Sequence, residues 1–502
     1  MRRFPFAATI AVLLAAGTAV APFAAADTAV EPLPSPRAHT AASVSAEDRL
    51  VQEYADVYTT PGVAAAVIHD DIVTTSVRGR DANGDAVTPR TPFRIGSMSK
   101  SMTAAAVMLL VQENALTLDD RVVDRLPEFR MADPRSRDIS VRQFLSHTSG
   151  LSITTNDEYA LPIPDTLRAT VAELRDRRLA AAPGTRFEYH NTNYALAARV
   201  VEAVSGTGFD DFLRERLFLP LGMGDTVSTV RCTDAVSGLA SGHTVLLRAA
   251  VPFPEMPGRC GGNGGVVSTL DDMVRWMRFT AGDVGADVLD PELRVQMQKP
   301  QPVAAPYALG WEARPAGDGF AAPLLIHGGT LATYAGSMAL AQDTGTAAIV
   351  LANGPGSPGS LAQNLIAQTD GHPRVSFDDP LTVANMIMLA IAIMLLVLFV
   401  TLFYRAKRWA ARRNVSARPR ILLRSVPLLV AFAGGLLVPL LPGLLGGMLL
   451  WEYWVIDLWL YPFLVLIALV LICGSSVVLA RRLFLLRKGR PAVASFDAPV
   501  TA

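Results

Sequence analysis

The segment FRIGSMSKSMTAAAVMLLVQE, residues 93–113, runs from a short β-rich stretch into a predicted helix that begins at about Ser97. Apolar residues in this helix recur at helical spacing, so we expect one of its faces to lie in the core. They are Ala104, Val107, Met108 and Val111. The segment therefore predicts a helix that starts beside a strand and packs into the protein interior.

Ser97 and Lys100 are three residues apart at the start of this helix, so their side chains share one face. The chain holds 45 lysines and arginines, of which only four are lysines. A serine hydroxyl needs a neighbouring group to take its proton, and a partly desolvated lysine can do so, whereas arginine effectively never loses its own proton. The positive field at a helix N-terminus also favours a developing oxyanion. So short a motif also arises by chance, and further segments are needed to support it.

The composition divides the chain into a soluble body and apolar ends. Basic and acidic residues balance at 45 each, which gives no argument for a nucleic-acid partner. Residues 1–26 have two arginines, an apolar run and a small-residue end, the layout of a secretory signal peptide. An uncleaved anchor helix is the alternative, and the region that follows is exported in either case. Residues 27–45 are expected to be a linker.

Three apolar runs follow within residues 382–480, at about 382–404, 426–450 and 456–480. Each is long enough to cross a bilayer as a helix, so we predict three transmembrane helices after a linker at 371–381. The segments after the first and third runs are basic without acidic residues, which places them and the tail at 481–502 in the cytoplasm. The chain is thus expected to be a multi-pass membrane protein with its soluble body outside the cytoplasm.

The exported part reads as an α+β domain over residues 46–370. A helix with a cap at Ser45 and Asp48 precedes two β-rich runs around HDD, which predict a hairpin within residues 62–79. Residues 115–275 look mostly helical, and residues 314–354 return to short apolar runs, followed by one more helix. Strands at both ends with helices between predict an antiparallel sheet flanked by helices, plus a helical subdomain.

Two further segments carry residues that suit acyl-transfer chemistry. Tyr189 and Asn191 lie in a loop before an amphipathic helix, where a tyrosinate near an ammonium can relay protons and an Asn amide can hold a carbonyl. Taken alone, Tyr189 is also explained as a packed aromatic and Asn191 as a helix cap. His327 precedes Gly328 and Gly329 on a predicted strand, where bare backbone lets a substrate approach or marks a bulge.

Together the three motifs, Ser-x-x-Lys, Tyr-x-Asn and His-Gly-Gly, resemble the penicillin-recognising serine hydrolases. The resemblance is nearest to the branch of class C β-lactamases, D-Ala-D-Ala carboxypeptidases and related esterases, and it covers about residues 48–370. It rests also on the phrases TPFRIGSMSK, LDDRVVDRLPEF, VRQFLSHTSGL, PGTRFEYHNTNYALAARVVE, GGVVSTLDDMVRW, YALGW and IVLANG. It implies a β-lactamase/transpeptidase-like fold and does not extend to the three-helix membrane region.

The resemblance also implies roles for the catalytic residues. Ser97 would be acylated, and Lys100 and Tyr189 would share its proton, pass it to the leaving group and later activate water. The backbone N–H groups of Ser97 and Thr330 would form the oxyanion hole.

On the substrate side, Asn191 would orient the substrate amide, and His327 would line the opposite wall together with Gly329. The segment 146–150 and the turn 261–265 look like framework near the cleft. Familiar β-lactamases have lysine and a hydroxyl residue where this chain has His327 and Gly328, which weakens the case for efficient penicillin hydrolysis.

The sequence leaves open whether Cys232 and Cys260 form a disulfide, while the compartment would allow it. We see no metal-ligand motif and expect neither a metal nor a cofactor. The resemblance implies an exported serine hydrolase that acts through a Ser97 acyl-enzyme on D-amino-acid peptides, peptidoglycan-like substrates or small esters and amides. The alternatives are a β-lactam-hydrolysing enzyme and a non-catalytic acylated sensor that signals through the membrane helices to an unknown protein partner.

Overall fold

The computed structural model describes residues 45–317, 320–411, 425–441, 459 and 461–488. The predicted signal peptide at 1–26 lies outside these residues, as do nearly all of the linker at 27–45 and the end of the tail after residue 488. Most residues of the two segments that connect the apolar runs also lie outside the described residues.

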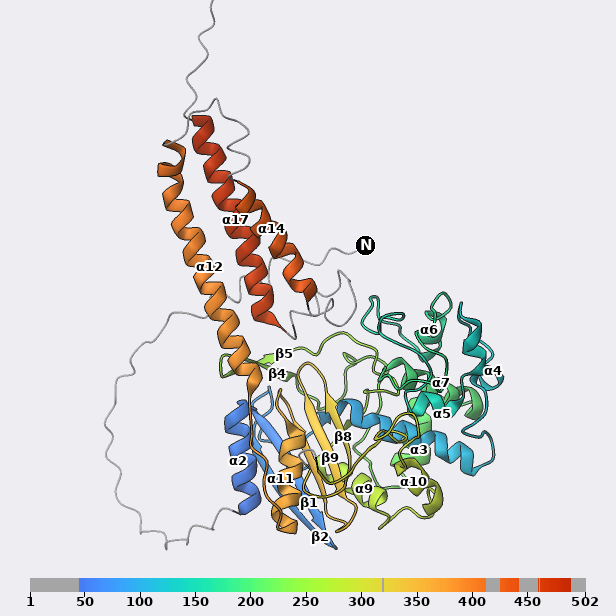
Figure 1. Ribbon diagram of the computed structural model, residues 1–502. Helices are drawn as coiled ribbons and strands as arrows, with labels where there is room; N and C mark the ends of the chain where they lie inside the picture. Colours follow the sequence, from blue (N-terminus) through green and yellow to red (C-terminus); the bar gives the residue numbers. More distant parts are fainter. Residues whose placement is uncertain (1–44, 318–319, 412–424, 442–458, 460, 489–502) are drawn as a thin grey trace, which may run out of the picture. The chain divides into compact units, whose positions relative to one another are not determined.

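A six-stranded antiparallel sheet forms the centre of the soluble domain, with strand order β2-β1-β10-β9-β8-β7 (Figure 1). The sheet joins both ends of the domain, as the sequence predicts, because β1 pairs with β10 and also with β2. The strands are β1 (Gly62–His69), β2 (Ile72–Gly79), β7 (Glu312–Arg314), β8 (Leu324–Thr330), β9 (Ala335–Ala341) and β10 (Ala347–Ala352).

The interior strand β1 is apolar along nearly its whole length because both of its faces are covered. Alternate side chains point to opposite faces of a strand. Val63, Ala65 and Val67 join the cluster with helices α2 (Ala46–Tyr58) and α11 (Pro358–Asp370). Ala64, Ala66 and Ile68 join the larger cluster on the other face. The predicted cap of α2 is confirmed, since the Ser45 hydroxyl accepts a hydrogen bond from the Asp48 amide.

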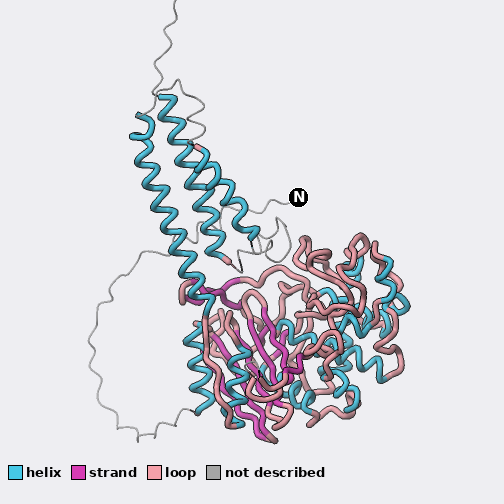
Figure 2. The backbone as a smooth tube through the Cα atoms, in the orientation of Figure 1, coloured by secondary structure: helices cyan, strands magenta, loops and turns pink. Residues whose placement is uncertain are grey.

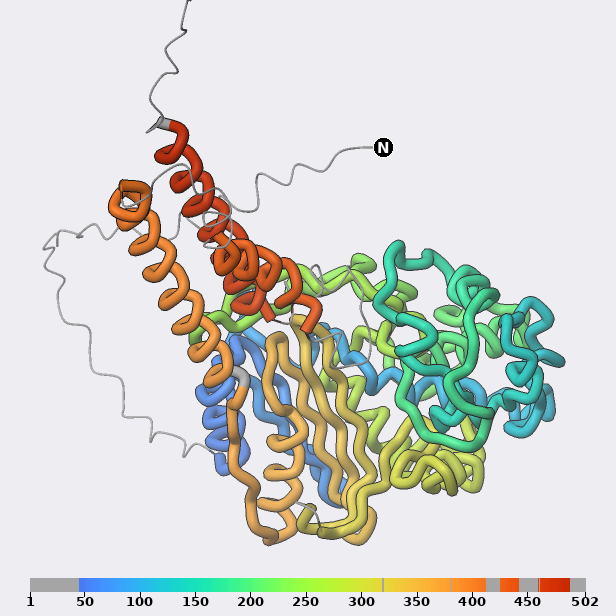
Figure 3. Tube along the Cα trace, turned by 45° about the horizontal axis from the view of Figure 1, so that its top comes forward, coloured from blue at the N-terminus to red at the C-terminus, as the bar shows by residue number. Residues whose placement is uncertain are grey.

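Further helices, joined by long loops, lie over the second face of the sheet and beside it (Figures 2 and 3). They are α3 (Ser99–Gln112), α4 (Val122–Arg125), α5 (Val141–Leu145), α6 (Leu167–Ala172), α7 (Thr192–Ser205), α8 (Phe209–Leu213), α9 (Leu270–Ala281) and α10 (Pro291–Gln298), with short 3-10 turns at Gly96–Met98 and Pro134–Asp138 and a π turn at Arg214–Phe218. The structure is the predicted α+β fold with a helical subdomain.

Two expectations for this region need correction. Helix α3 is buried on every side from Ser99 to Leu110, not on one face only. It lies between the sheet and the helical subdomain, so its small residues contact neighbours all round. The stretch 115–275 also contains strands: the hairpin of β4 (Gly242–Leu246) and β5 (Ala249–Phe253), and β6 (Val267–Ser268), which pairs with β3 (Phe93–Arg94). These strands are short and lack a clear alternation, so periodicity did not indicate them.

The prediction of three membrane helices is also corrected. Among the residues described, two helices are long and apolar enough to cross a membrane, Thr382–Ala411 and Pro462–Arg487. They belong to α12 (Pro380–Ala411) and α17 (Pro462–Lys488). In the second apolar run, the described residues form α14 (Val426–Leu437) and a 3-10 turn at Val438–Leu440, and the continuation of the run lies outside the described residues.

The apolar helices contact one another closely. Phe399, Leu428 and Val478, one from each helix, form a small cluster. A Cβ built on Gly435 of α14 would lie 2.9 Å from the Ala468 carbonyl oxygen of α17, so glycine allows this close approach.

Candidate active site

Ser97 and Lys100 are brought together where strand β3 turns into helix α3. Ser97, where the sequence predicts the helix to begin, lies on the 3-10 turn Gly96–Met98; α3 itself begins at Ser99, and Lys100 lies on its first turn. The Lys100 Nζ donates to the Ser97 Oγ at 2.9 Å. Gly96 precedes the serine with a φ of +53°, a left-handed conformation that favours glycine.

The Lys100 ammonium is fully buried and meets three acceptors. Its Nζ donates to Ser97 Oγ, to Asn191 Oδ1 at 2.7 Å and to the Asn263 backbone carbonyl at 2.8 Å. Burial lowers the pKa of Lys100 to about 7, and the negative charge of Glu158 opposes part of that decrease. After Lys100 loses one proton, the other two remain with Asn191 and Asn263, whose oxygens only accept. The lone pair then faces Ser97, which is the one partner of the three that can donate.

Tyr189 approaches the same serine from the loop before helix α7. Its ring centroid lies 4.9 Å from the Lys100 Nζ, and its hydroxyl is close enough to Ser97 for that side chain to affect its pKa. The residue is 40% exposed, yet its hydroxyl end is desolvated. This desolvation raises the pKa of Tyr189 above its ordinary value, although the neighbouring Ser97 side chain lowers it in part. Tyr189 is therefore a neutral phenol at pH 7, not the tyrosinate considered from the sequence.

Asn191 connects the lysine to a carboxylate. Its side chain does not cap helix α7, although the residue occupies the cap position. Instead, its Oδ1 accepts from Lys100, and its Nδ2 donates to Glu158 Oε1 at 2.9 Å. The Glu158 carboxylate also accepts from the Asn191 backbone amide at 2.6 Å. The amide of Asn191 is thereby held at the edge of the site with one of its two N–H donors still available.

His147, in the predicted framework segment, supports Tyr189 from behind. Its ring lies 4.3 Å from the Tyr189 ring, centroid to centroid. Its Nδ1 accepts from the His190 amide and the Asn193 side chain at 3.2 Å each. Burial, and then the charge of Lys100, keep the pKa of His147 well below its ordinary value. His147 is thus a neutral packing residue.

Strand β8 forms the opposite side of the site. A Cβ on Gly329 would lie 1.9 Å from the Ile95 carbonyl oxygen and 3.3 Å from the Ser97 nitrogen, so only glycine permits this approach. From the other side, a Cβ on Gly96 would lie 3.0 Å from the Thr330 nitrogen. The backbone nitrogens of Ser97 and Thr330, the expected oxyanion donors, therefore lie close to this contact of strand and turn.

His327 is buried on β8 and carries no charge. Its Nδ1 donates to the Gly328 carbonyl at 2.8 Å, which leaves Nε2 as the acceptor that faces the Tyr307 hydroxyl at 3.3 Å. Burial, together with the charge of Lys100, lowers the pKa of His327 to about 3. His327 therefore offers no positive charge to a substrate carboxylate.

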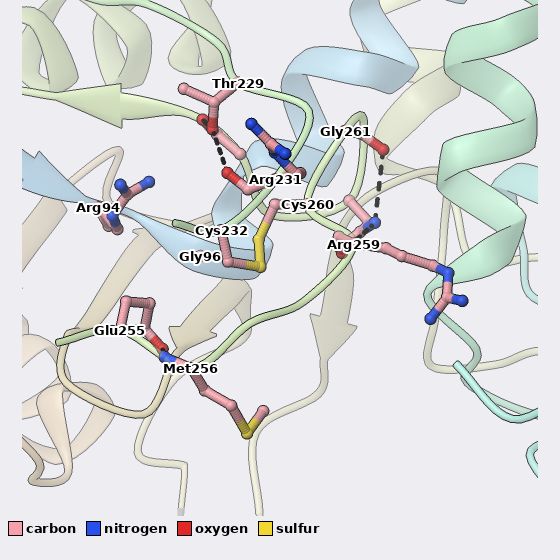
Figure 4. The surroundings of a disulfide bond; sticks show 12 residues. Arg94, Gly96, Thr229, Arg231, Cys232, Glu255, Met256, Arg259, Cys260 and Gly261 are labelled. Atoms are coloured by element: carbon pink, nitrogen blue, oxygen red, sulfur yellow. Dashed lines mark hydrogen bonds between the residues drawn. A yellow bond between two sulfur atoms is a disulfide. The ribbon is translucent and has the colours of Figure 1, made fainter. Parts of the chain in front are cut away.

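The turn at 261–265 contributes more than framework, because its Asn263 carbonyl accepts a hydrogen bond from Lys100. This turn begins directly after Cys260, which forms a disulfide with Cys232 (Figure 4). The disulfide joins two segments that also pair through the bridge between Arg231 and Arg259. The structure thus forms the cross-link that the sequence left open, next to the turn that contacts Lys100.

Sequence reasoning missed Glu158 and the Asn263 carbonyl. Glu158 stands in a loop of ordinary polar composition, and a backbone carbonyl has no signature of residue type. The Asn263 carbonyl had one indirect signal, the glycine-rich segment RCGGNGG. Glu158 had none.

A serine, a buried lysine of lowered pKa and a phenol, beside an antiparallel sheet flanked by helices, define a serine hydrolase of the β-lactamase fold. A family model described as Beta-lactamase matches residues 48–371, well over half of the chain. The chain belongs to this family.

Relatives and solved structures agree with the family. The chain is 35% identical over 233 residues to Penicillin-binding protein 4 of Amycolatopsis lactamdurans, a match that spans 44% of this chain and 60% of that protein. It is 26% identical over 393 residues to Protein flp of Staphylococcus aureus strain MW2, covering 73% of this chain and 75% of the relative.

Two solved structures show the extent of the shared fold. The octameric penicillin-binding protein homologue from Pyrococcus abyssi aligns with a TM-score of 0.56 at 25% identity, over 66% of this chain and 78% of that one. A D-stereospecific amidohydrolase from Streptomyces sp. aligns with a TM-score of 0.52 at 22% identity, over 65% and 99% of the two chains, and shows the fold alone.

Proposed function

We propose that this serine hydrolase forms an acyl-enzyme on Ser97 with small esters, amides or D-amino-acid peptides. The observation that carries the proposal is the set of three acceptors around Lys100, which turns the lone pair of the neutral amine toward the Ser97 hydroxyl. A lysine with a pKa of about 7 is available as a base at neutral pH.

In the acylation step, Lys100 takes the proton of Ser97 as its oxygen attacks the substrate carbonyl. The amides of Ser97 and Thr330 stabilise the oxyanion, and the neutral phenol of Tyr189 donates a proton to the leaving group. The proton taken by Lys100 returns to Tyr189. In the second step, the same groups activate water and release the acyl group from Ser97.

The charge of the site favours substrates without a carboxylate near the scissile bond. His327 is neutral and Gly328 has no hydroxyl, so neither can bind the carboxylate that penicillins carry. The same argument favours esters, and amides of D-amino acids without a free carboxylate next to the scissile bond, over peptides that end in D-Ala-D-Ala. Efficient β-lactam hydrolysis is the less favoured activity.

We also propose that the domain is exported and anchored. The apolar helices α12 and α17 support anchoring by length and composition, and the basic flanks of the apolar runs support an extracytoplasmic domain with a cytoplasmic C-terminus. Proteolysis of intact cells, read with an antibody to the domain, tests this orientation. Protection of the domain from external protease would contradict it.

The enzymatic proposal is tested with the full-length chain in detergent. D-Ala-D-Ala peptides, p-nitrophenyl esters and nitrocefin are screened for turnover, and a fluorophosphonate probe for covalent labelling. We expect turnover of esters or peptides above nitrocefin, and loss of both turnover and labelling in Ser97→Ala. Turnover that survives Ser97→Ala would refute the mechanism, while labelling without repeated turnover would favour the sensor alternative.

A further inference from the structure

We propose that Glu158 is a positioning residue of the active site, which fixes the amide of Asn191 between itself and Lys100 and supplies the counter-charge to that lysine. The inference rests on the proposed function, since it concerns the same base. Glu158 lies in the loop between helices α5 and α6, and its side chain is only 11% exposed. Its backbone carbonyl accepts a hydrogen bond from Arg259 at 2.8 Å, which holds the loop against the site.

The orientation of the Asn191 amide follows from its two neighbours. A lysine ammonium is a donor only, and an ionised carboxylate is an acceptor only. The amide oxygen must therefore face Lys100, and the amide nitrogen must face Glu158, as the contacts of 2.7 Å and 2.9 Å show. Without the carboxylate, the contact with Lys100 alone would hold the Asn191 amide, and its nitrogen would lose the acceptor that fixes it.

A purely structural role for Glu158 is the competing explanation. Its Oε2 accepts from the Asn191 backbone amide at the start of α7, a helix of 14 residues, and a carboxylate there stabilises a helix N-terminus. This contact alone would make Glu158 a capping residue supplied by another segment. The two roles differ in what happens to Lys100, because only the positioning role couples the carboxylate to the base.

Few charged groups compete with Glu158 for the lysine. The titratable side chains that face Lys100 are Glu158, Tyr189, Tyr194, His147 and His327. Glu158 itself also faces His190, whose Nδ1 lies 3.6 Å from Oε2. Burial keeps both tyrosines as neutral phenols, and His147 and His327 are held neutral by burial and by Lys100. Among the described residues, Glu158 is thus the one carboxylate whose charge acts on Lys100.

The sign of the coupling can be measured. Glu158 favours the charged form of Lys100 and so raises its pKa against the effect of burial. Replacing Glu158 by glutamine keeps the size and an acceptor oxygen but removes the charge, so the pKa of Lys100 falls further. Because the neutral lysine is the active form, the acid limb of the pH profile should move to lower pH. We expect a shift of about one unit for the loss of one nearby charge.

The experiment measures the rate of Ser97 labelling by a fluorophosphonate, and kcat/KM for a p-nitrophenyl ester, between pH 5 and 9 with the full-length chain in detergent. For Glu158→Gln we expect a lower plateau, by about tenfold, and an acid limb about one unit below that of the wild type. Glu158→Asp keeps the charge, so its limb returns toward the wild-type position even if its plateau stays reduced. Asp165→Asn is the matched control, since this acid of the same loop is 79% exposed and should leave the limb unmoved.

The outcomes separate the inference from the function on which it rests. A reduced plateau with an unmoved limb in Glu158→Gln would leave Glu158 a structural cap and overturn the inference, while the proposed function stands. A profile identical to the wild type would overturn it as well. Absence of Ser97 labelling in the wild type would refute the proposed function, and this inference with it.

Discussion

Replacing Lys100 with arginine preserves a positive charge at the active site but removes a group that can lose a proton. At pH 7 an ordinary lysine with a pKa of 10.5 is neutral in about one molecule in 3000, whereas Lys100, with a pKa of about 7, is neutral in about half. Burial thus increases the supply of the base by about a thousandfold. Arginine stays protonated throughout this range, so we expect kcat/KM for a p-nitrophenyl ester to fall by about 10³-fold in Lys100→Arg.

The same reasoning fixes the pH profile of the wild type. Activity should rise with pH through an acid limb near pH 7 and reach a plateau above about pH 8, because only the neutral lysine accepts the Ser97 proton. Lys299→Arg is the matched control, since Lys299 is exposed and distant in sequence. Activity of Lys100→Arg within tenfold of the wild type, or a wild-type limb near pH 10, would show that the buried lysine is not the base.

Three further predictions concern the elements around the base. Gly329→Ala should abolish labelling of Ser97, because the added Cβ would lie 1.9 Å from the Ile95 carbonyl oxygen. Gly328→Ala is the control and should label normally, because its Cβ would meet only one atom, at 4.0 Å. Equal labelling of the two variants would contradict this reasoning. Tyr189→Phe should keep measurable labelling but lower ester turnover by about 10²-fold, because the phenol donates to the leaving group, and unchanged turnover would remove it from the mechanism. Replacing Cys232 and Cys260 by serine should destabilise the domain by about 3 kcal/mol, measured by denaturant unfolding in detergent; no loss of stability would show that the cross-link contributes nothing.

The sequence predicted the elements whose signals are local. The hairpin of β1 and β2, the helix α2 with its Ser45 cap, and the strands β8 to β10 all follow from periodicity and turn residues over fewer than 20 positions. The pairing of β1 with β10 was also predictable, because strands at both ends of a domain with helices between them have few other ways to form one sheet.

Other features depended on contacts that no local pattern encodes. The hairpin of β4 and β5 was missed because its strands are short and irregular. Helix α3 was expected to be amphipathic, and its burial on every side is decided by the sheet and the subdomain that enclose it. The second apolar run was long enough for a span by composition, yet its described part is the 12-residue helix α14 and a short turn.

The sequence by itself determined that Ser97 and Lys100 lie one helical turn apart, because helical periodicity sets that spacing. It could not determine that Lys100 has a lowered pKa and contacts Ser97 through its amine. That property comes from burial and from three oxygen atoms, two of which belong to Asn191 and Asn263, 91 and 163 positions away. Desolvation and hydrogen bonding act through space, and a backbone carbonyl leaves no mark on residue type. The chemistry of the site was therefore decided by the tertiary structure, which brings these segments around one lysine.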